Sequence, residues 1–251
     1  MSAIETRPHV YVGFDPNEIM AVNAAVASIR LQSLDGPYDI RHLSLSHLSA
    51  QNLYLRPTER RDNHLWDVIS EAPMTTEHAI ARFFVPLLCD YRGWAVFMDG
   101  DVLVRRSLSE LFALADHTKA IQVVQHPPMT SAIDKKDGQP QTLYTRKNWS
   151  SVMLFNNAHP SNRKLTLDLL NGVPGRDLHR FCWLVDSEIG ALPPEWNYLV
   201  GVSDPQADPA IVHYTLGCPK PPSSNLPFAA EWFQSARAAK YDLRDLVEPL
   251  A

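Results

Sequence analysis

The feature that most constrains the fold is the order in which short apolar runs and helix-periodic segments alternate near the start of the chain. "HVYVGF" (His9–Phe14) has the composition of a short buried strand, and from Ile19 to Ile29 apolar residues recur at helical spacing. "YDIRHLSL" (Tyr38–Leu45) then predicts a second strand. A strand, a helix and a strand in this order are typical of a parallel sheet with helices on its faces. The sequence therefore predicts an α/β fold.

The rest of the chain continues this alternation. Asp15, followed by Pro16 and Glu18, predicts the N-cap of the first helix. Pro86 is expected to kink or end the helix in which it lies. Further strands are predicted at Trp94–Met98, Ala120–His126 and Ser150–Asn157, and further helices at Thr75–Cys89, Ser107–Asp116, Asn162–Gly172 and Ala229–Tyr241.

Composition narrows the class of protein. The 251 residues, 45% of them hydrophobic, can bury one sizeable core. The net charge of −5 and the absence of a basic block argue against nucleic acid or an anionic membrane surface as a partner. No apolar run approaches the roughly 20 residues of a membrane helix, and the first residues lack the apolar core of a signal peptide. Three scattered cysteines fit a reducing compartment. We therefore expect a cytoplasmic protein without a transmembrane segment; the oligomeric state stays open.

A pair of aspartates follows the strand predicted at Trp94–Met98. Asp99 and Asp101 are two residues apart, so strand alternation sends both side chains to the same side. Gly100 between them leaves room for a ligand to approach the backbone. Adjacent carboxylates repel each other, and a hard divalent cation such as Mg²⁺ or Mn²⁺ removes that repulsion. An Asp-Gly turn without any ligand is the competing interpretation.

A second group of polar residues follows another apolar run, in "AIVHYTLGCPKP". By itself His213 is more often a structural histidine than a metal ligand. Gly217 and Lys220 follow on a loop, the combination expected where backbone and an ammonium group meet a diphosphate. Lys220 alone would be interpreted as a solvated surface lysine.

Two earlier residues each have two interpretations. Arg82 lies in a largely apolar helix and fits either a snorkelling arginine or a contact to phosphate or sugar hydroxyls. Asp15 fits either a helix cap or a residue beside a nucleotide held by the first strand–helix turn. The residues alone leave both pairs of alternatives open.

Taken in order, these segments resemble glycosyltransferase family 8, the glycogenin-like and lipopolysaccharide-galactosyltransferase-like enzymes. "ARFFVPLLCDYRGWAVFMDGDVLV" is similar to the family's arginine–proline–DxD block, "SSVMLFN" to its next conserved strand, and "HYTLGCPKP" to its His-x-x-Gly-x-x-Lys-Pro ending. "RKNWSSVMLFNNAHPSN" and "LHRFCWLVDSEIGALPPEWNYLVG" resemble an uncharacterised bacterial and phage subgroup still more closely. The resemblance spans about Val10 to Lys220.

The resemblance implies a GT-A fold, a single mixed Rossmann-like sheet flanked by helices, in one domain over residues 1–251. Its nucleotide-binding half would span about 8–126, its acceptor and donor-sugar half about 127–222 and a C-terminal helix about 229–251. It also implies a metal-dependent hexosyltransferase that uses a UDP-sugar and Mn²⁺ (or Mg²⁺), generally with retention. The implied metal ligands are Asp99, Asp101 and His213; the implied donor-binding residues are Asp15, Asn17, Arg82, Gly100, Gly217 and Lys220; the implied catalytic residues are Asp186, Arg82 and Asn156.

Two other functions stay open at this point. A haloacid-dehalogenase-like phosphohydrolase also places Asp-x-Asp after an apolar strand, with the first aspartate as nucleophile. A non-catalytic nucleotide-sugar-binding protein would keep the metal site without turnover. The donor sugar and the acceptor are not indicated, because acceptor specificity lies in loops, here expected at Gln51–Thr75 and Pro127–Asn148.

Overall fold

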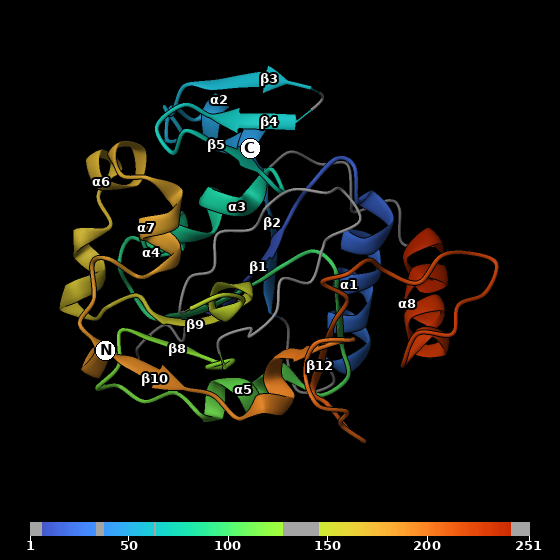
Figure 1. The fold of residues 1–251 in the computed structure, drawn as a ribbon. Coiled ribbons are helices and arrows are strands. Elements are labelled where there is room, and N and C mark those ends of the chain that lie inside the picture. The colour runs from blue at the N-terminus through green and yellow to red at the C-terminus, as the bar shows by residue number, and fades with distance from the viewer. Residues whose placement is uncertain (1–6, 34–37, 63, 128–145, 242–251) are drawn as a thin grey trace.

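A computed structural model describes residues 7–33, 38–62, 64–127 and 146–241. These residues contain a six-stranded sheet in the order β10-β8-β9-β6-β1-β2 (Figure 1). β9 is antiparallel to both of its neighbours, and every other adjacent pair is parallel. The predicted α/β class with a mixed sheet is confirmed. The strands of this sheet are β1 (His9–Gly13), β2 (Asp39–Leu43), β6 (Trp94–Met98), β8 (Ile121–Val123), β9 (Val152–Asn156) and β10 (Ile189–Ala191).

Two smaller three-stranded sheets accompany the large one. One has the order β11-β12-β7, with β11 at Tyr198–Leu199, β12 at Ile211–His213 and β7 at Val102–Val104. The other is the antiparallel meander β3 (Thr58–Arg61), β4 (His64–Asp67) and β5 (Ala72–Met74). The meander lies inside Gln51–Thr75, so the prediction that this segment is a loop is wrong over much of its length. The loop predicted at Pro127–Asn148 falls almost wholly outside the described residues.

Most predicted helices form, with changed boundaries. The helices are α1 (Ile19–Gln32), α2 (Leu45–Ala50), α3 (His78–Ala81), α4 (Val85–Leu88), α5 (Leu108–Ala113), α6 (Leu167–Gly172), α7 (Gly175–His179) and α8 (Ala229–Tyr241). Short 3₁₀ segments are η1 (Arg82–Phe84), η2 (Trp149–Ser151), η3 (Pro160–Lys164), η4 (Asp186–Glu188) and η5 (Pro194–Asn197).

Helix starts show where local sequence rules hold and where they do not. Ser107, the first residue of the helix predicted at Ser107–Asp116, caps α5, because its hydroxyl accepts from the Ser109 amide. Asp15 is not the N-cap of α1; that position belongs to Glu18. The Asp15 carboxylate instead accepts from the backbone amides of Asn17 and Glu77, which joins the β1–α1 turn to the segment before α3.

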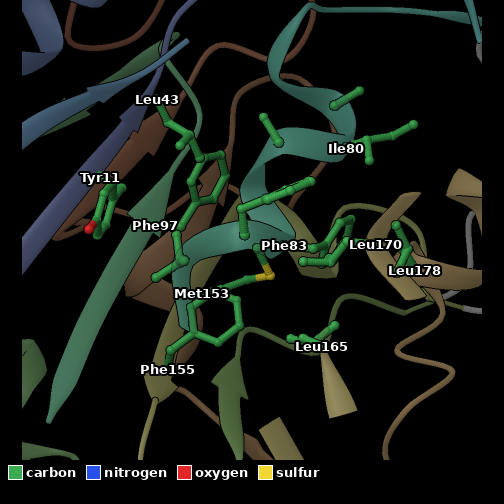
Figure 2. Close-up of a cluster of buried hydrophobic side chains, with 14 of the residues drawn as sticks. Tyr11, Leu43, Ile80, Phe83, Phe97, Met153, Phe155, Leu165, Leu170 and Leu178 are labelled. Atoms are coloured by element: carbon green, nitrogen blue, oxygen red, sulfur yellow. The ribbon is translucent and has the colours of Figure 1, made fainter. Parts of the chain in front are cut away.

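The central strands are apolar on both faces, as expected when helices cover both sides. Along β6, Phe97 points to one core, where it meets Phe83 of η1 and Met153 of β9 (Figure 2). Val96 and Met98 point to the other core, which α1 covers. Full burial of one such side chain contributes about 1.5–3 kcal/mol, so the two cores hold the sheet between its helices.

The C-terminal helix packs back against the first helix of the chain. Figure 1 shows α8 alongside α1, and Trp232 of α8 is buried in a third cluster with Ala24 of α1 and Leu103 of β7. β9 and β10 come from the predicted acceptor half yet lie in the same sheet as β1 and β6. Among the described helices, not one has the length and apolar character needed to cross a membrane.

Gly100 occupies a position where a side chain has no space. A Cβ atom there would lie 2.5 Å from the Gly13 carbonyl oxygen and 2.7 Å from Val22 Cγ2. The glycine is therefore needed for close packing of the Asp-Gly-Asp segment against the β1–α1 turn, whereas the sequence interpretation was room for a ligand.

We expect Gly100→Ala to lower the free energy of unfolding by about 1–3 kcal/mol, because the backbone atom it meets cannot move aside cheaply. Urea unfolding measures this. Gly172→Ala is the matched control, since a Cβ there meets nothing within 4 Å. Equal destabilisation by the two substitutions would contradict the packing argument.

Candidate metal and donor site

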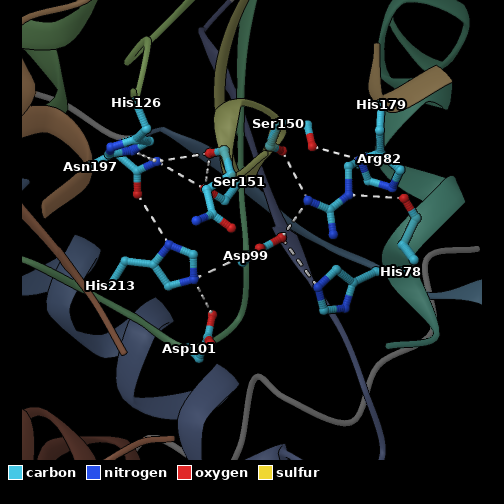
Figure 3. Close-up of polar contacts among 12 residues, drawn as sticks. His78, Arg82, Asp99, Asp101, His126, Ser150, Ser151, His179, Asn197 and His213 are labelled. Atoms are coloured by element: carbon cyan, nitrogen blue, oxygen red, sulfur yellow. Dashed lines mark hydrogen bonds and ion pairs between the residues drawn. The ribbon is translucent and has the colours of Figure 1, made fainter. Parts of the chain in front are cut away.

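Three side chains able to bind a metal ion converge where β6 ends. One ligand atom from each of Asp99, Asp101 and His213 lies within 4.8 Å of the other two, and we call these residues the triad. His213 Nε2 lies 3.1 Å from Asp101 Oδ1 and 3.9 Å from Asp99 Oδ2 (Figure 3). The side chain of His213 is 3% exposed and those of Asp99 and Asp101 are 16% and 20% exposed. The triad therefore opens to solvent on its carboxylate side.

Strand pairing brings the distant His213 to the two aspartates. Asp99 directly follows β6 and Asp101 directly precedes β7. β7 pairs antiparallel with β12, which places His213 opposite Val102, and the Tyr214 amide donates to the Asp101 carbonyl at 3.0 Å. The triad thus forms at the junction of two sheets.

An arginine and a histidine hold Asp99 on the side that faces away from the rest of the triad. Arg82 Nη1 lies 2.9 Å and His78 Nε2 lies 3.3 Å from Asp99 Oδ1. Both come from the α3–η1 segment, four residues apart, so they share one helical face. Arg82 also donates to the backbone carbonyls of Ser150 and Ala79. Asp99 is therefore held by a buried arginine and keeps Oδ2 for the triad.

A turn at Asn148–Ser151 connects the two sides of the site. The Asp99 amide donates to the Ser151 carbonyl at 2.9 Å, and Asn197 Nδ2 donates to Ser151 Oγ at 2.9 Å. Asn197 Oδ1 in turn lies 3.1 Å from His213 Nδ1. Figure 3 shows this continuous network from Arg82 to His213.

The electrostatics of the site favour a cation. Burial raises the pKa of Asp99, but Arg82, His78 and His213 lower it more, so the pKa lies below its ordinary value and Asp99 is ionised. Burial, with added repulsion from Asp101 and Asp15, raises the pKa of Glu18 to about 7. Several acidic groups thus lie close together around Asp101.

The donor set fits a divalent cation of the Mg²⁺ or Mn²⁺ type. It offers two carboxylates and one imidazole nitrogen on a partly open site, which leaves positions for a substrate oxygen. His213 already has a hydrogen-bond partner on its other ring nitrogen, as metal-binding histidines usually do.

Metal binding is expected to weaken as the pH falls, because a proton and the metal compete for His213 Nε2. Burial lowers the pKa of His213, but the carboxylates of Asp101 and Asp99 raise it by more, so the pKa lies above the ordinary value for a histidine. Affinity should therefore rise with pH through that raised pKa and level off above it. Calorimetric Mn²⁺ titrations across pH measure this, and an affinity that does not change with pH would exclude His213 as a ligand.

The other predicted donor-binding residues come from two segments. One segment follows β1, and the other is the loop that follows His213. Asp15, which is buried, and Asn17, which is exposed, follow β1. Gly217 has a positive φ of 118° on the loop that leaves His213, and its amide donates to the Tyr214 carbonyl. That loop lines a pocket of about 380 Å³ together with the exposed Lys220. Arg82 contacts the triad directly, through its ion pair with Asp99.

Asn156 and Asp186 are not brought to the triad. β9 runs antiparallel to β6, so Asn156 pairs with Trp94 at the far end of the strand from Asp99. Its side-chain amide donates to the carbonyls of His117 and Lys119, which is a structural role. Asp186 is 90% exposed and pairs with Arg146. The start of β9, where Val152 pairs with Met98, is the end of the strand that lies near the triad.

Several residues in the network were not identified from sequence. His78 had a usable signal, since it lies one helical turn before Arg82 on the same face. Asn197, Ser151 and His126 had none, because each reaches the site through a loop or through strand pairing. His126 Nε2 accepts from Asn197 Nδ2 at 3.1 Å. Burial and the nearby His213 lower the pKa of His126 to about 4, so its ring is neutral and able to accept.

Comparison with known proteins gave one curated relative and several solved structures. Protein CDI of Arabidopsis thaliana is 39% identical over 221 residues, which cover 86% of this chain and 80% of that protein. No family model matches the chain. Because this relative is a plant protein, membership of a bacterial or phage subgroup stays a prediction.

The solved structures show the fold. The bifunctional glycosyltransferase WbbM superposes with a TM-score of 0.64 at 17% identity, covering 97% of this chain and 52% of its own, so this chain spans about half its length. The galactosyltransferase LgtC, solved with donor and acceptor sugar analogues, gives 0.55 at 14% identity, with 92% and 95% covered. The glycosyltransferase GlyE of Streptococcus pneumoniae gives 0.54 at 16% identity, with 98% and 66% covered.

The predicted GT-A architecture is thus confirmed, with a carboxylate–histidine triad at the edge of its sheet. The identity and coverage shared with the Arabidopsis protein establish the relationship at the level of sequence. The chain belongs to the family of Protein CDI and has the GT-A fold of glycosyltransferases.

Proposed function

We propose that this protein is a metal-dependent glycosyltransferase that moves a sugar from a nucleotide-sugar donor to a hydroxyl acceptor. The observation that carries the proposal is the triad, two carboxylates and a histidine within 4.8 Å of one another at the end of β6. Ligands of open α/β sheets bind beyond the carboxyl ends of the strands, where the triad lies. A UDP-sugar, Mn²⁺ and retention of the anomeric configuration are the finer parts of the proposal.

Different residues would bind different parts of the donor. A divalent cation held by the triad would supply positive charge for the two phosphates of the donor. Arg82 keeps Asp99 ionised and fixed in place. The amides and Lys220 of the loop after His213 would bind the diphosphate. In support, this loop lines a pocket of about 380 Å³, within the usual size of ligand sites of about 300–1,000 Å³. Asp15 and Asn17 would lie beside the nucleoside.

Catalysis would come from charge stabilisation at the leaving group. When the bond between sugar and phosphate breaks, negative charge grows on the nucleotide diphosphate. An ammonium group at Lys220 stabilises that charge more in the transition state than in the ground state, which lowers the barrier. Because Asn156 lies at the other end of β9, it is not part of the proposed site. Asp186, which pairs with Arg146, is proposed only as a residue that orients the sugar.

The phosphohydrolase alternative has little to support it in the site. There the first aspartate must attack as a nucleophile, whereas Asp99 Oδ1 is paired with Arg82 and approached by His78. An ion pair of this kind lowers the reactivity of a carboxylate and suits a fixed ligand. The fold also matches glycosyltransferases.

A donor screen tests the proposal. The protein is incubated with Mn²⁺ and a panel of nucleotide sugars, and release of the nucleotide is measured with and without chelator. Metal-dependent release from one UDP-sugar supports the proposal, and the anomeric configuration of the product then decides retention. Binding of UDP and Mn²⁺ without any turnover would instead support the non-catalytic protein, and phosphate release from a simple ester would support the phosphohydrolase.

The cytoplasm remains the proposed location. Cys89, Cys182 and Cys218 are all free thiols, which agrees with a reducing compartment.

A further inference from the structure

Asn197 is a fully buried asparagine that joins three separate segments beside the triad. Its Oδ1 lies 3.1 Å from His213 Nδ1 on β12. Its Nδ2 lies 2.9 Å from Ser151 Oγ, 3.1 Å from His126 Nε2 and 3.4 Å from the Asn148 carbonyl oxygen. None of its surface is exposed to solvent. Such a side chain has a single orientation available to it.

The partners of Asn197 determine which end of its amide faces which neighbour. The Ser151 hydroxyl donates its one proton to the Asn148 carbonyl at 2.8 Å, so Ser151 Oγ must accept from Asn197. The Asn148 carbonyl can only accept as well. The NH₂ group of Asn197 therefore faces this turn, and its carbonyl oxygen faces His213.

That orientation determines the tautomer of His213. Asn197 Oδ1 has no proton to give, so the hydrogen bond requires a proton on His213 Nδ1. In the neutral ring the lone pair then lies on Nε2, the atom that is 3.1 Å from Asp101 and 3.9 Å from Asp99. The imidazole thus presents an unprotonated nitrogen to the point where the two carboxylates meet.

We propose that Asn197 is a positioning residue that sets the tautomer and the ring orientation of His213 for metal binding. The metal part of this inference rests on the proposed function, whereas the tautomer is a property of the chain itself. Backbone pairing supports the arrangement, because Asn197 ends η5 and the following strand β11 pairs Leu199 with His213. Through Ser151 the same amide is linked to the turn that accepts from the Asp99 amide.

The tautomer is measured in the metal-free wild-type protein. Histidine labelled with ¹⁵N is observed by long-range proton–nitrogen spectra at a pH above the pKa of His213, with His213→Gln used to assign the signals. We expect a protonated Nδ1 and an unprotonated Nε2. A proton on Nε2 in the neutral wild-type ring would overturn the proposal, whatever the variants show.

Substitution of Asn197 tests the consequence for metal affinity. Asn197→Leu removes every hydrogen bond at nearly constant volume and is expected to weaken Mn²⁺ binding by roughly 10–100-fold, the usual cost of losing such a partner. The ring should also lose its single tautomer. An unchanged Mn²⁺ dissociation constant, measured by electron paramagnetic resonance of free Mn²⁺, would contradict the proposal.

Two further variants separate positioning from general destabilisation. Asn162 is equally buried and its side chain bonds Ala120, Asn156 and Trp183 away from the triad. Asn162→Leu should therefore lower stability without changing Mn²⁺ affinity, and a similar loss of affinity there would count against a specific role. Asn197→Asp keeps an oxygen facing His213 Nδ1 and should keep the wild-type tautomer. If the leucine variant does not fold, a changed tautomer in this aspartate variant would overturn the proposal.

Failure of this inference is distinguishable from failure of the proposed function. Tautomer and Mn²⁺ affinity are read without any sugar donor. If both behave as expected and no nucleotide sugar is turned over, the proposed activity is wrong and the positioning role stands. If turnover is found and His213 carries its proton on Nε2, the activity stands and the positioning role is wrong.

Discussion

Asp99→Asn is expected to abolish Mn²⁺-dependent binding of UDP and to reduce metal-dependent turnover of any sugar donor to background. The substitution keeps the shape of the side chain but removes the charge of a carboxylate that is ionised and aimed at His213 and Asp101. Loss of a hydrogen-bond partner of a ligand costs roughly 10–100-fold in metal affinity, so loss of a ligand should cost at least about 100-fold. Calorimetric titration of UDP with and without Mn²⁺ measures the effect.

A suitable control makes the same aspartate-to-asparagine change at a position away from the triad. Asp116 is an exposed aspartate whose carboxylate caps the turn at Thr118. Asp116→Asn should leave Mn²⁺-dependent UDP binding intact. Because Asp99→Asn also leaves Arg82 without its counter-ion, circular dichroism must show that the variant is folded. Undiminished Mn²⁺-dependent binding of UDP by folded Asp99→Asn would sink the assignment of the site.

Arg56→Ala is expected to have the largest effect on stability, about 3–5 kcal/mol, because it leaves a buried carboxylate without its partner. Asp67 is fully buried, and Arg56 donates to it from both Nε and Nη2. Arg56 Nη1 also donates to the carbonyls of Leu170 and Val173, so the residue ties the β3–β5 meander to α6. Such a loss is a large part of the 5–15 kcal/mol that holds a typical domain folded.

Arg61→Ala is the matched control in the same meander. Arg61 pairs with Glu59 on the exposed face of β3, and both side chains are about half exposed. Exposed pairs contribute about 0–1 kcal/mol, so urea unfolding should show little change. Comparable destabilisation by the two alanine substitutions would contradict the role given to the buried pair.

The same pair predicts a pH dependence of stability. Burial raises the pKa of Asp67, but Arg56 and Ser70 lower it more, so its folded pKa lies below 3.8. A carboxylate whose pKa is lowered by folding contributes stability above its ordinary pKa and loses that contribution as the pH falls toward the folded value. The free energy of unfolding of the wild-type protein should therefore fall as the pH drops from the ordinary pKa of an aspartate toward the lower folded pKa of Asp67. Arg56→Ala should show a weaker acid dependence, because the cause of the lowered pKa is gone.

Local features of the sequence were enough to predict the class of fold and two of the three residues of the triad. Apolar runs such as Trp94–Met98 form strands because both of their faces are buried, and that property is visible in composition alone. Asp99 and Asp101 follow one such strand, so their convergence needed no knowledge of the rest of the chain. Ser107 caps its helix because the capping bond joins neighbours in sequence.

Features that depend on the direction of a strand, or on which strands pair with each other, could not be predicted from the sequence. Nothing in "SSVMLFNN" says whether the strand runs with or against β6, so the position of Asn156 at the far end of β9 from the triad could not be predicted. The meander β3–β5 was missed because its exposed strand "TERR" has no apolar alternation. Asn197 reaches His213 only because β11 pairs with β12.

The sequence by itself determined which residues are buried as strands and helices and where two carboxylates follow a strand, since these properties depend on neighbours within a few positions. The tertiary structure alone decided that β12 lies antiparallel to β7, which brings His213 to Asp101, and that a buried amide orients the ring. Contacts between segments about a hundred residues apart depend on how the sheets and helices pack around shared cores. For that reason the metal site is complete only in the folded chain.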